Sequence, residues 1–288
     1  MDPHPYRVVV DGVSTRAVVV SDRRGERPNL ADGDCPLCLG GAESPQQSVG
    51  PYAFANRWPA LGPGRCEVVA YSSDHDADLG RLSHLETAAV VDLWAARTVA
   101  LASLPEVARV LVFENRGAEA GATVAHPHSQ LFALPPGALP IDPAAPVAEG
   151  ADCPLCAPAD ADRLVESADD WTTEVPAAPL SPYAVRISPR RHVGTLADLT
   201  SVERQALARA LCRAVARMDN LFSLPMPYHL WIGQAPDTHL RVDIVGLRRS
   251  ASALRVLGAA EMATGLFFSP IAPRTAAATL RATAAGNR

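Results

Sequence analysis

A set of two cysteines and two histidines occurs twice in this chain at nearly the same spacing. The two sets, in chain order, are Cys35, Cys38, His75 and His126, and then Cys153, Cys156, His192 and His239. The step from the first cysteine to the first histidine runs from 35 to 75 in one set and from 153 to 192 in the other. Two thiolates and two imidazoles form the complete tetrahedral shell of a zinc ion. The repeat therefore predicts an internal duplication with one metal site in each half.

Zinc is the metal that these ligands favour, and iron is the alternative at one of the sites. A single Cys-x-x-Cys pair also suits a redox motif, but four of the eight histidines fall at matching offsets from the two pairs. In the second set His229 competes with His239 as the fourth ligand. Because zinc with four protein ligands is structural by default, we expect two structural zinc ions per chain.

Composition restricts the class of protein. The 288 residues are 48% hydrophobic and 20% charged, which is typical of a soluble globular protein with two modest domains or one large one. The net charge of −5 argues against general affinity for nucleic acid, and all 26 basic residues are arginines, which bind phosphate in a bidentate way. No apolar run predicts a membrane span, and no N-terminal signal is evident. Paired cysteines in such a chain favour metal over disulfides, so we expect a cytoplasmic protein.

The expected secondary structure also repeats. The first half predicts a hairpin over 6–20, strands 52–55 and 67–71, a helix over 82–104, and strands 109–114 and 130–134. The second half predicts strands 171–175 and 183–188, a helix over 201–218 capped by Thr200 or Ser201, strands 229–233 and 240–247, and a short helix over 274–284. In the first helix the expected buried face consists of Leu85, Ala89, Val90, Leu93 and Ala96.

Each half is therefore an α+β unit, with antiparallel strands and a flanking helix. The stretch 134–150 is rich in proline, alanine and glycine and indicates a linker. We expect two domains, residues 1–138 and residues 139–288, with a zinc site in each.

Only the first half carries a second histidine two residues after its last metal ligand, in His126-Pro127-His128-Ser129-Gln130. A loop of small residues, 117–125, precedes it, and such residues let the backbone approach a phosphate. On a strand, residues two apart face the same side, so His126, His128 and Gln130 are expected to share one surface. This asymmetry predicts one chemically active half and one structural half.

The active half resembles the signature of the galactose-1-phosphate uridylyltransferases, a family of the histidine-triad superfamily. The matching pieces are Phe113-Glu114-Asn115-Arg116-Gly117 and His126-Pro127-His128-Ser129-Gln130. Segments 21–28, 54–61 and 72–75 also resemble family segments, in the same order. The resemblance implies a fold of duplicated histidine-triad-like units, with residues 1–138 as the catalytic half.

The resemblance also implies roles for individual residues. His128 would be the nucleophile, and Gln130 would stand where the hydrolase branch has a third histidine. Arg116 is a further candidate for stabilising charge on the phosphoryl group. The expected substrate-binding residues are Arg24, Arg27, Asn56, Arg57, Asn115, Gly121, Ala122, Thr123 and Glu261.

The expected activity is transfer of a nucleoside monophosphate from a nucleotide sugar to a sugar 1-phosphate, of the UDP-glucose–hexose-1-phosphate uridylyltransferase type, through a nucleotidyl-histidine. The loop 118–122 is closer to the related ADP-glucose phosphorylases, so phosphorolysis with inorganic phosphate is the first alternative. A dinucleotide hydrolase is disfavoured by Gln130, because an amide cannot shuttle a proton. A zinc-stabilised, non-catalytic binding module is the alternative from another class. The expected partners are these small substrates and a second copy of the chain, with neither nucleic acid nor membrane.

Overall fold

A sheet of nine strands forms the centre of the computed structural model, which describes residues 6–10, 12, 17–21, 34–44, 50–136 and 153–285. Every neighbouring pair in this sheet is antiparallel. From one edge to the other, the strands are β3 (Tyr52–Ala55), β4 (Cys66–Ala70), β6 (His128–Leu134), β5 (Arg109–Arg116), β10 (Tyr228–Gly233), β11 (Arg241–Gly246), β9 (Ala184–Pro189), β8 (Trp171–Glu174) and β7 (Leu164–Ala168).

The sheet consists of two repeats joined at its middle. The first half follows the order β3-β4-β6-β5, and the second half follows the same path as β8-β9-β11-β10. The two repeats meet where β5 and β10 pair antiparallel, from Val112–Ile232 to Arg116–Tyr228. This arrangement confirms the predicted α+β fold of duplicated antiparallel units. The predicted boundary between residues 138 and 139 lies outside the described residues and stays a prediction.

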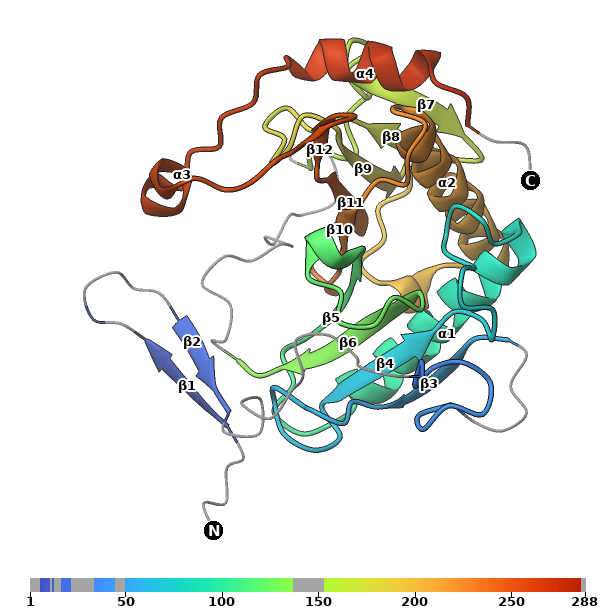
Figure 1. Ribbon diagram of the computed structural model, residues 1–288, viewed down its shortest axis with the longest axis vertical. Coiled ribbons are helices and arrows are strands. Elements are labelled where there is room, and N and C mark those ends of the chain that lie inside the picture. Colours follow the sequence, from blue (N-terminus) through green and yellow to red (C-terminus); the bar gives the residue numbers. More distant parts are fainter. Residues whose placement is uncertain are drawn as a thin grey trace.

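Each half contributes one long helix, and the two helices pack against each other on one side of the sheet (Figure 1). These are α1 (His84–Ala102) and α2 (Ser201–Asn220). Both begin with a capping box, Ser83 with Glu86 and Thr200 with Glu203, which satisfies amide groups left open in the first turn. Thr200 is therefore the cap of the second helix, and Ser201 is its first residue.

The buried face of α1 differs from the one expected. Leu85 is 79% exposed, and of the five residues named for that face only Val90 is fully buried. The buried face instead includes Thr87, Trp94 and Thr98, whose polar atoms have partners in the core. A pattern based on apolar residues alone missed this face because two of its positions are threonines.

Smaller elements surround the central sheet. Near the N-terminus, β1 (Arg7–Val10) and β2 (Ala17–Val20) form the predicted hairpin as a separate sheet. After β11 come β12 (Arg248–Ser250), β13 (Ala253–Leu254) and α3 (Ala259–Thr264), which lies on an arm away from the sheet in Figure 1. The predicted C-terminal helix is present as α4 (Pro273–Ala282) and packs against β7. The strands β7, β12 and β13 and the helix α3 were not predicted.

Most of the predicted linker lies outside the described residues. Within the described ranges, every helix is too short or too polar to cross a lipid bilayer.

Candidate active site and metal centres

The structure brings the first cysteine and histidine set together from three separate segments, which contain the pair Cys35 and Cys38, His75, and His126. The Nδ1 atom of His126 lies 3.7 Å from the Cys35 sulfur and 3.6 Å from the Cys38 sulfur, and the Cys38 sulfur lies 3.3 Å from Nδ1 of His75. A tetrahedral zinc ion, with bonds of about 2.3 Å to sulfur and about 2.05 Å to nitrogen, would separate such atoms by about 3.6 Å. The four ligand atoms therefore enclose a space that fits a tetrahedral metal ion.

The second set has the same geometry. Nδ1 of His239 lies 3.3 Å from the Cys153 sulfur and 3.5 Å from the Cys156 sulfur, and Nδ1 of His192 lies 3.3 Å from the Cys156 sulfur. His229 lies outside this cluster, and the fourth member of the cluster is His239.

The other ring nitrogen of each central histidine is held in the same way. Nε2–H of His126 donates to the carbonyl of Ser72, and Nε2–H of His239 donates to the carbonyl of Pro189, both at 2.8 Å. Such bonds fix the tautomer that offers Nδ1 to a metal. Burial lowers the pKa of both His126 and His239, which keeps the two rings neutral and able to bind.

His128 is the first residue of β6, and its ring is oriented by its own chain. Nδ1–H of His128 donates to the carbonyl of His126 at 2.8 Å. The proton is therefore on Nδ1, and Nε2 carries the lone pair that can attack an electrophile. The acceptor is a backbone carbonyl, and it belongs to a residue of the first cysteine and histidine cluster.

The expectation that His126, His128 and Gln130 share one strand surface is only half correct. Strand β6 begins at His128, and His126 lies before it with its ring turned into the metal cluster. Pro127 lacks an N–H group and cannot extend the ladder, which is why the strand starts after it. His128 and Gln130 do alternate with the core-facing Ser129.

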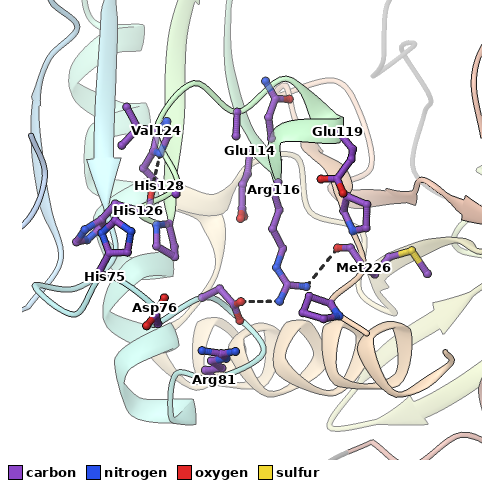
Figure 2. Close-up of a pocket in the computed structure, with 18 of the residues that line it drawn as sticks. His75, Asp76, Arg81, Glu114, Arg116, Glu119, Val124, His126, His128 and Met226 are labelled. Atoms are coloured by element: carbon purple, nitrogen blue, oxygen red, sulfur yellow. Dashed lines mark hydrogen bonds and ion pairs between the residues drawn. The ribbon is translucent and has the colours of Figure 1, made fainter. Parts of the chain in front are cut away.

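A cavity of about 380 Å³ opens beside His128, between the two halves of the chain. Its wall includes Asn115 and Ala122, two of the predicted substrate-binding residues, together with Val124. Figure 2 shows Arg116 reaching across this cavity, with His126 and His128 on one side and Glu119 on the other. Polar groups and a backbone loop beside an oriented imidazole suit a phosphorylated ligand.

Arg116 joins the two halves under the cavity. Its guanidinium donates to both carboxylate oxygens of Asp219 in α2, at 2.6 and 3.0 Å, and to Asp78 at 2.5 Å. These carboxylates raise the pKa of Arg116, so it stays charged. The sequence suggested an arginine that stabilises charge on the phosphoryl group. The structure shows a half-buried arginine whose charge is already paired.

Glu114 is a buried carboxyl group that the sequence reasoning left without a role. Its side chain accepts hydrogen bonds from the hydroxyls of Tyr71, at 2.8 Å, and Tyr228, at 3.1 Å. Burial raises the pKa of Glu114 to about 7. The alternation along β5 could have predicted that Glu114 is buried, because Val110, Val112 and Glu114 all point to the helix side and are buried.

Asn56 and Gln130 lie together, away from the lining of the cavity. The Asn56 amide donates to Oε1 of Gln130 at 3.1 Å, and Oδ1 of Asn56 accepts from the backbone of Trp58. This bond occupies the amide oxygen of Gln130 and leaves its NH₂ group as the donor. The two residues come from two separate segments that resemble the family, 54–61 and 126–130, and they meet across β4.

The remaining predicted residues have mixed placements. Gly121 ends a short 3₁₀ turn at φ +79°, a conformation that favours glycine, and Thr123 follows in the same loop. Arg57 is exposed and lies over the Trp58 ring. The Glu261 carboxylate pairs with Arg255 in the C-terminal arm and lies outside the cavity lining. Arg24 and Arg27 lie outside the described residues.

Comparison with protein-family models places both halves in one family. The model of the N-terminal domain of galactose-1-phosphate uridyl transferase matches residues 55–136, and the model of its C-terminal domain matches residues 138–242. A galactose-1-phosphate uridylyltransferase of Thermotoga maritima is 32% identical over 302 residues, covering 92% of this chain and 95% of the relative. One from Streptomyces lividans is 34% identical, covering 77% of this chain and 67% of the relative.

Solved structures with a similar fold agree with this family assignment. A uridylyltransferase structure superposes with a TM-score of 0.82 at 25% identity, covering 96% of this chain and 97% of that one. An ADP-glucose phosphorylase from Arabidopsis thaliana shares the fold, with a TM-score of 0.73 at 22% identity over 97% of this chain and 99% of that one. The relatives, the family models and the arrangement around His128 agree, and this chain is therefore a nucleotidyltransferase that belongs to the galactose-1-phosphate uridylyltransferase family.

Proposed function

We propose that this chain moves a uridylyl group from a nucleotide sugar to a hexose 1-phosphate through a covalent intermediate on His128. The observation that carries the proposal is the bond from Nδ1–H of His128 to the carbonyl of His126, which orients Nε2 beside a cavity of suitable size. The family relationship supports the choice of a uridylyl group.

The reaction has two balanced steps. The Nε2 lone pair of His128 forms a bond to the α-phosphorus of the nucleotide sugar while the bond from that phosphorus to the sugar 1-phosphate oxygen breaks. An oxygen of the incoming sugar 1-phosphate then forms a bond to the same phosphorus, and the N–P bond breaks. Both the leaving group and the second nucleophile are ionised phosphates at pH 7, so a strong general acid or base is unnecessary.

The loop before His128 would bind the transferring group, together with Gln130, which lies outside the cavity lining but shares one face of β6 with His128. The NH₂ of Gln130 can donate to a non-bridging oxygen, while its oxygen is held by Asn56. Because an amide does not carry a proton to or from water, this position favours phosphate acceptors over hydrolysis. Arg24, Arg27, Asn115 and Thr123 are proposed as further contacts to phosphate or sugar.

The two metal clusters would hold zinc as structural ions. The ligand set of two sulfurs and two nitrogens in each cluster is that of a closed zinc site, without an open position for substrate. A zinc ion supplies rigidity here, and His126, once fixed, offers its carbonyl to His128 in a constant position. We also propose that the protein is a homodimer, because the C-terminal arm exposes the side chains of Val256, Met262 and Phe268, which a second copy of the chain would cover. A cytoplasmic location is part of the same proposal.

Mass spectrometry of the intact protein tests the nucleophile. After incubation with UDP-glucose, the wild type is expected to gain the mass of one uridylyl group, and His128→Asn is expected to gain none while keeping its full zinc content. Adding galactose 1-phosphate or inorganic phosphate should discharge the adduct, and the faster acceptor separates a transferase from a phosphorylase. An adduct of equal yield on His128→Asn would refute the assignment.

A further inference from the structure

The loop that precedes His128 belongs to the first half, but residues of the second half hold it. His229, in β10, donates from Nε2–H to the carbonyl of Ala120 at 3.1 Å. Arg248, in β12, lies 3.6 Å from the Glu119 carboxylate. Pro227 packs so closely against Gly117 that a Cβ there would lie 3.2 Å from the Pro227 Cβ. Three contacts from the second half thus converge on one short turn.

His229 has no part in the second metal cluster, which contains His239 instead. It pairs with Asn115 across the junction of β5 and β10, and its neighbours Tyr228 and Leu230 are buried on the other side. Alternation along β10 therefore places the His229 ring on the sheet face opposite the long helices. The ring reaches the loop from this face.

The Ala120 carbonyl is the atom by which His229 attaches the turn to the second half of the chain. Inside the turn, the amides of Ala120 and Gly121 donate to the carbonyls of Gly117 and Ala118. These bonds shape the turn but do not fix it to the rest of the molecule. Ala120 itself is buried, and the bond from His229 attaches the turn to the central strand of the other half.

The two ends of loop 117–125 are held by different contacts. At its C-terminal end His126 is a ligand of the first metal cluster, and His128 follows after Pro127. At its N-terminal end the turn is held by His229. Between these points Ala122, Val124 and Ala125 line the cavity beside His128. A shift of the turn would move this wall relative to the attacking nitrogen.

We propose that His229 is a positioning residue for nucleotidyl transfer: by binding the Ala120 carbonyl, it holds loop 117–125 at the distance from His128 that the reacting phosphoryl group requires. The inference rests on the function proposed above for His128. It assigns to the second half a part in catalysis beyond its own metal centre.

The test uses the zinc-loaded full chain in single-turnover reactions with excess UDP-glucose. His229→Phe keeps a ring but removes the donor, and His229→Gln replaces Nε2–H with an amide N–H at a similar reach. His84→Phe is the matched control, because His84 begins α1 in the first half, outside the cavity lining. Quenching and intact-mass measurement give the rate constant and the final amount of uridylyl-protein.

We expect the rate constant of His229→Phe to fall by about tenfold or more, since small misplacements of reacting groups have effects of this size. The final amount of adduct should stay near one per chain, and His229→Gln should recover most of the rate. A purely structural role would instead lower the amount of adduct and leave the rate constant of the remaining molecules unchanged.

Three results would each overturn the inference while the role of His128 stands. They are a wild-type rate constant in His229→Phe, a lower amount of uridylyl-protein with an unchanged rate constant, and a His229→Gln variant as slow as His229→Phe. Absence of any adduct in the wild type, or an adduct of equal yield on His128→Asn, would overturn the proposed function and this inference together.

Discussion

Glu114 gives the protein a dependence on pH that a single substitution can isolate. The carboxyl group is 2% exposed, and burial raises its pKa to about 7 from the ordinary 4.5. A carboxyl whose pKa is higher in the folded state stabilises that state fully below pH 4.5, and the contribution is lost as the pH rises through 7. The predicted perturbation is Glu114→Gln, which keeps the shape of the side chain and removes the titration.

The size of the effect follows from the shift. A difference of about 2.5 units corresponds to about 3 kcal/mol of unfolding free energy between fully protonated and fully ionised conditions. Between pH 5 and pH 9, where the measurement is practical, about 2 to 3 kcal/mol of this difference is developed. The stability of Glu114→Gln relative to the wild type should therefore rise by that amount from pH 5 to pH 9.

Urea unfolding of the zinc-loaded protein at several pH values measures this difference directly. All other titrating groups are common to both proteins and cancel in the comparison. The matched control is Glu106→Gln, because Glu106 is exposed and the substitution makes the same change from carboxyl to amide outside the core. If the Glu114→Gln difference does not change with pH, or changes no more than that of the control, the carboxyl does not titrate with a raised pKa and the reasoning fails.

Three further perturbations test separate parts of the structure. Arg116→Met should lower the unfolding free energy by about 3 kcal/mol or more, measured by urea titration, because it leaves the buried Asp78 and the half-buried Asp219 without their cation. Cys156→Ala should reduce the metal content, measured by elemental analysis, from two ions per chain to one, and equal loss at both sites would contradict independent clusters. The hydrogen bond from Arg191 lowers the pKa of Glu203 to about 2, so the ionised Glu203 stabilises the fold fully above pH 4.5, and this stabilisation is lost as the pH falls toward 2. Glu203→Gln should therefore make the unfolding free energy less dependent on pH in this range, measured by acid unfolding followed by circular dichroism.

Features that repeat along the sequence were predictable. The spacing of cysteines and histidines identified the members of both clusters that could hold a metal, and alternating apolar residues identified most strands of the central sheet. Both signals are carried by residues that are near in sequence or in regular steps. The order of strands in the sheet required the family resemblance or the structure. Strand pairing between β5 and β10 joins residues more than a hundred positions apart, and no local pattern records it.

Polar residues of the core account for most of what was missed. Trp94 donates to Ser129 at 2.7 Å, and Gln234 bonds to Thr98, so polar positions occupy the interior where an apolar pattern would place leucine or valine. Arg116 was similar: an arginine in a signature next to a phosphate loop suggests a ligand contact, but its partners Asp78 and Asp219 come from distant segments. Each of these groups is buried because it has a partner, and the partner is known only once the chain is folded.

The partners of charged residues also explain why only one half carries the proposed nucleophile, His128. Counting from the central metal histidine of each half, the position of His128 is taken by Arg241 in the second half and that of Gln130 by Asp243. Arg241 lies 3.1 Å from Asp243, which also binds Arg186 at 2.8 Å, so charged pairs occupy the place of an oriented imidazole and an amide donor. A guanidinium has no lone pair available for attack on phosphorus at neutral pH. The second half therefore retains the cysteine and histidine cluster and the strand geometry of the repeat, while its contacts to Arg116 and Ala120 support the cavity of the first half.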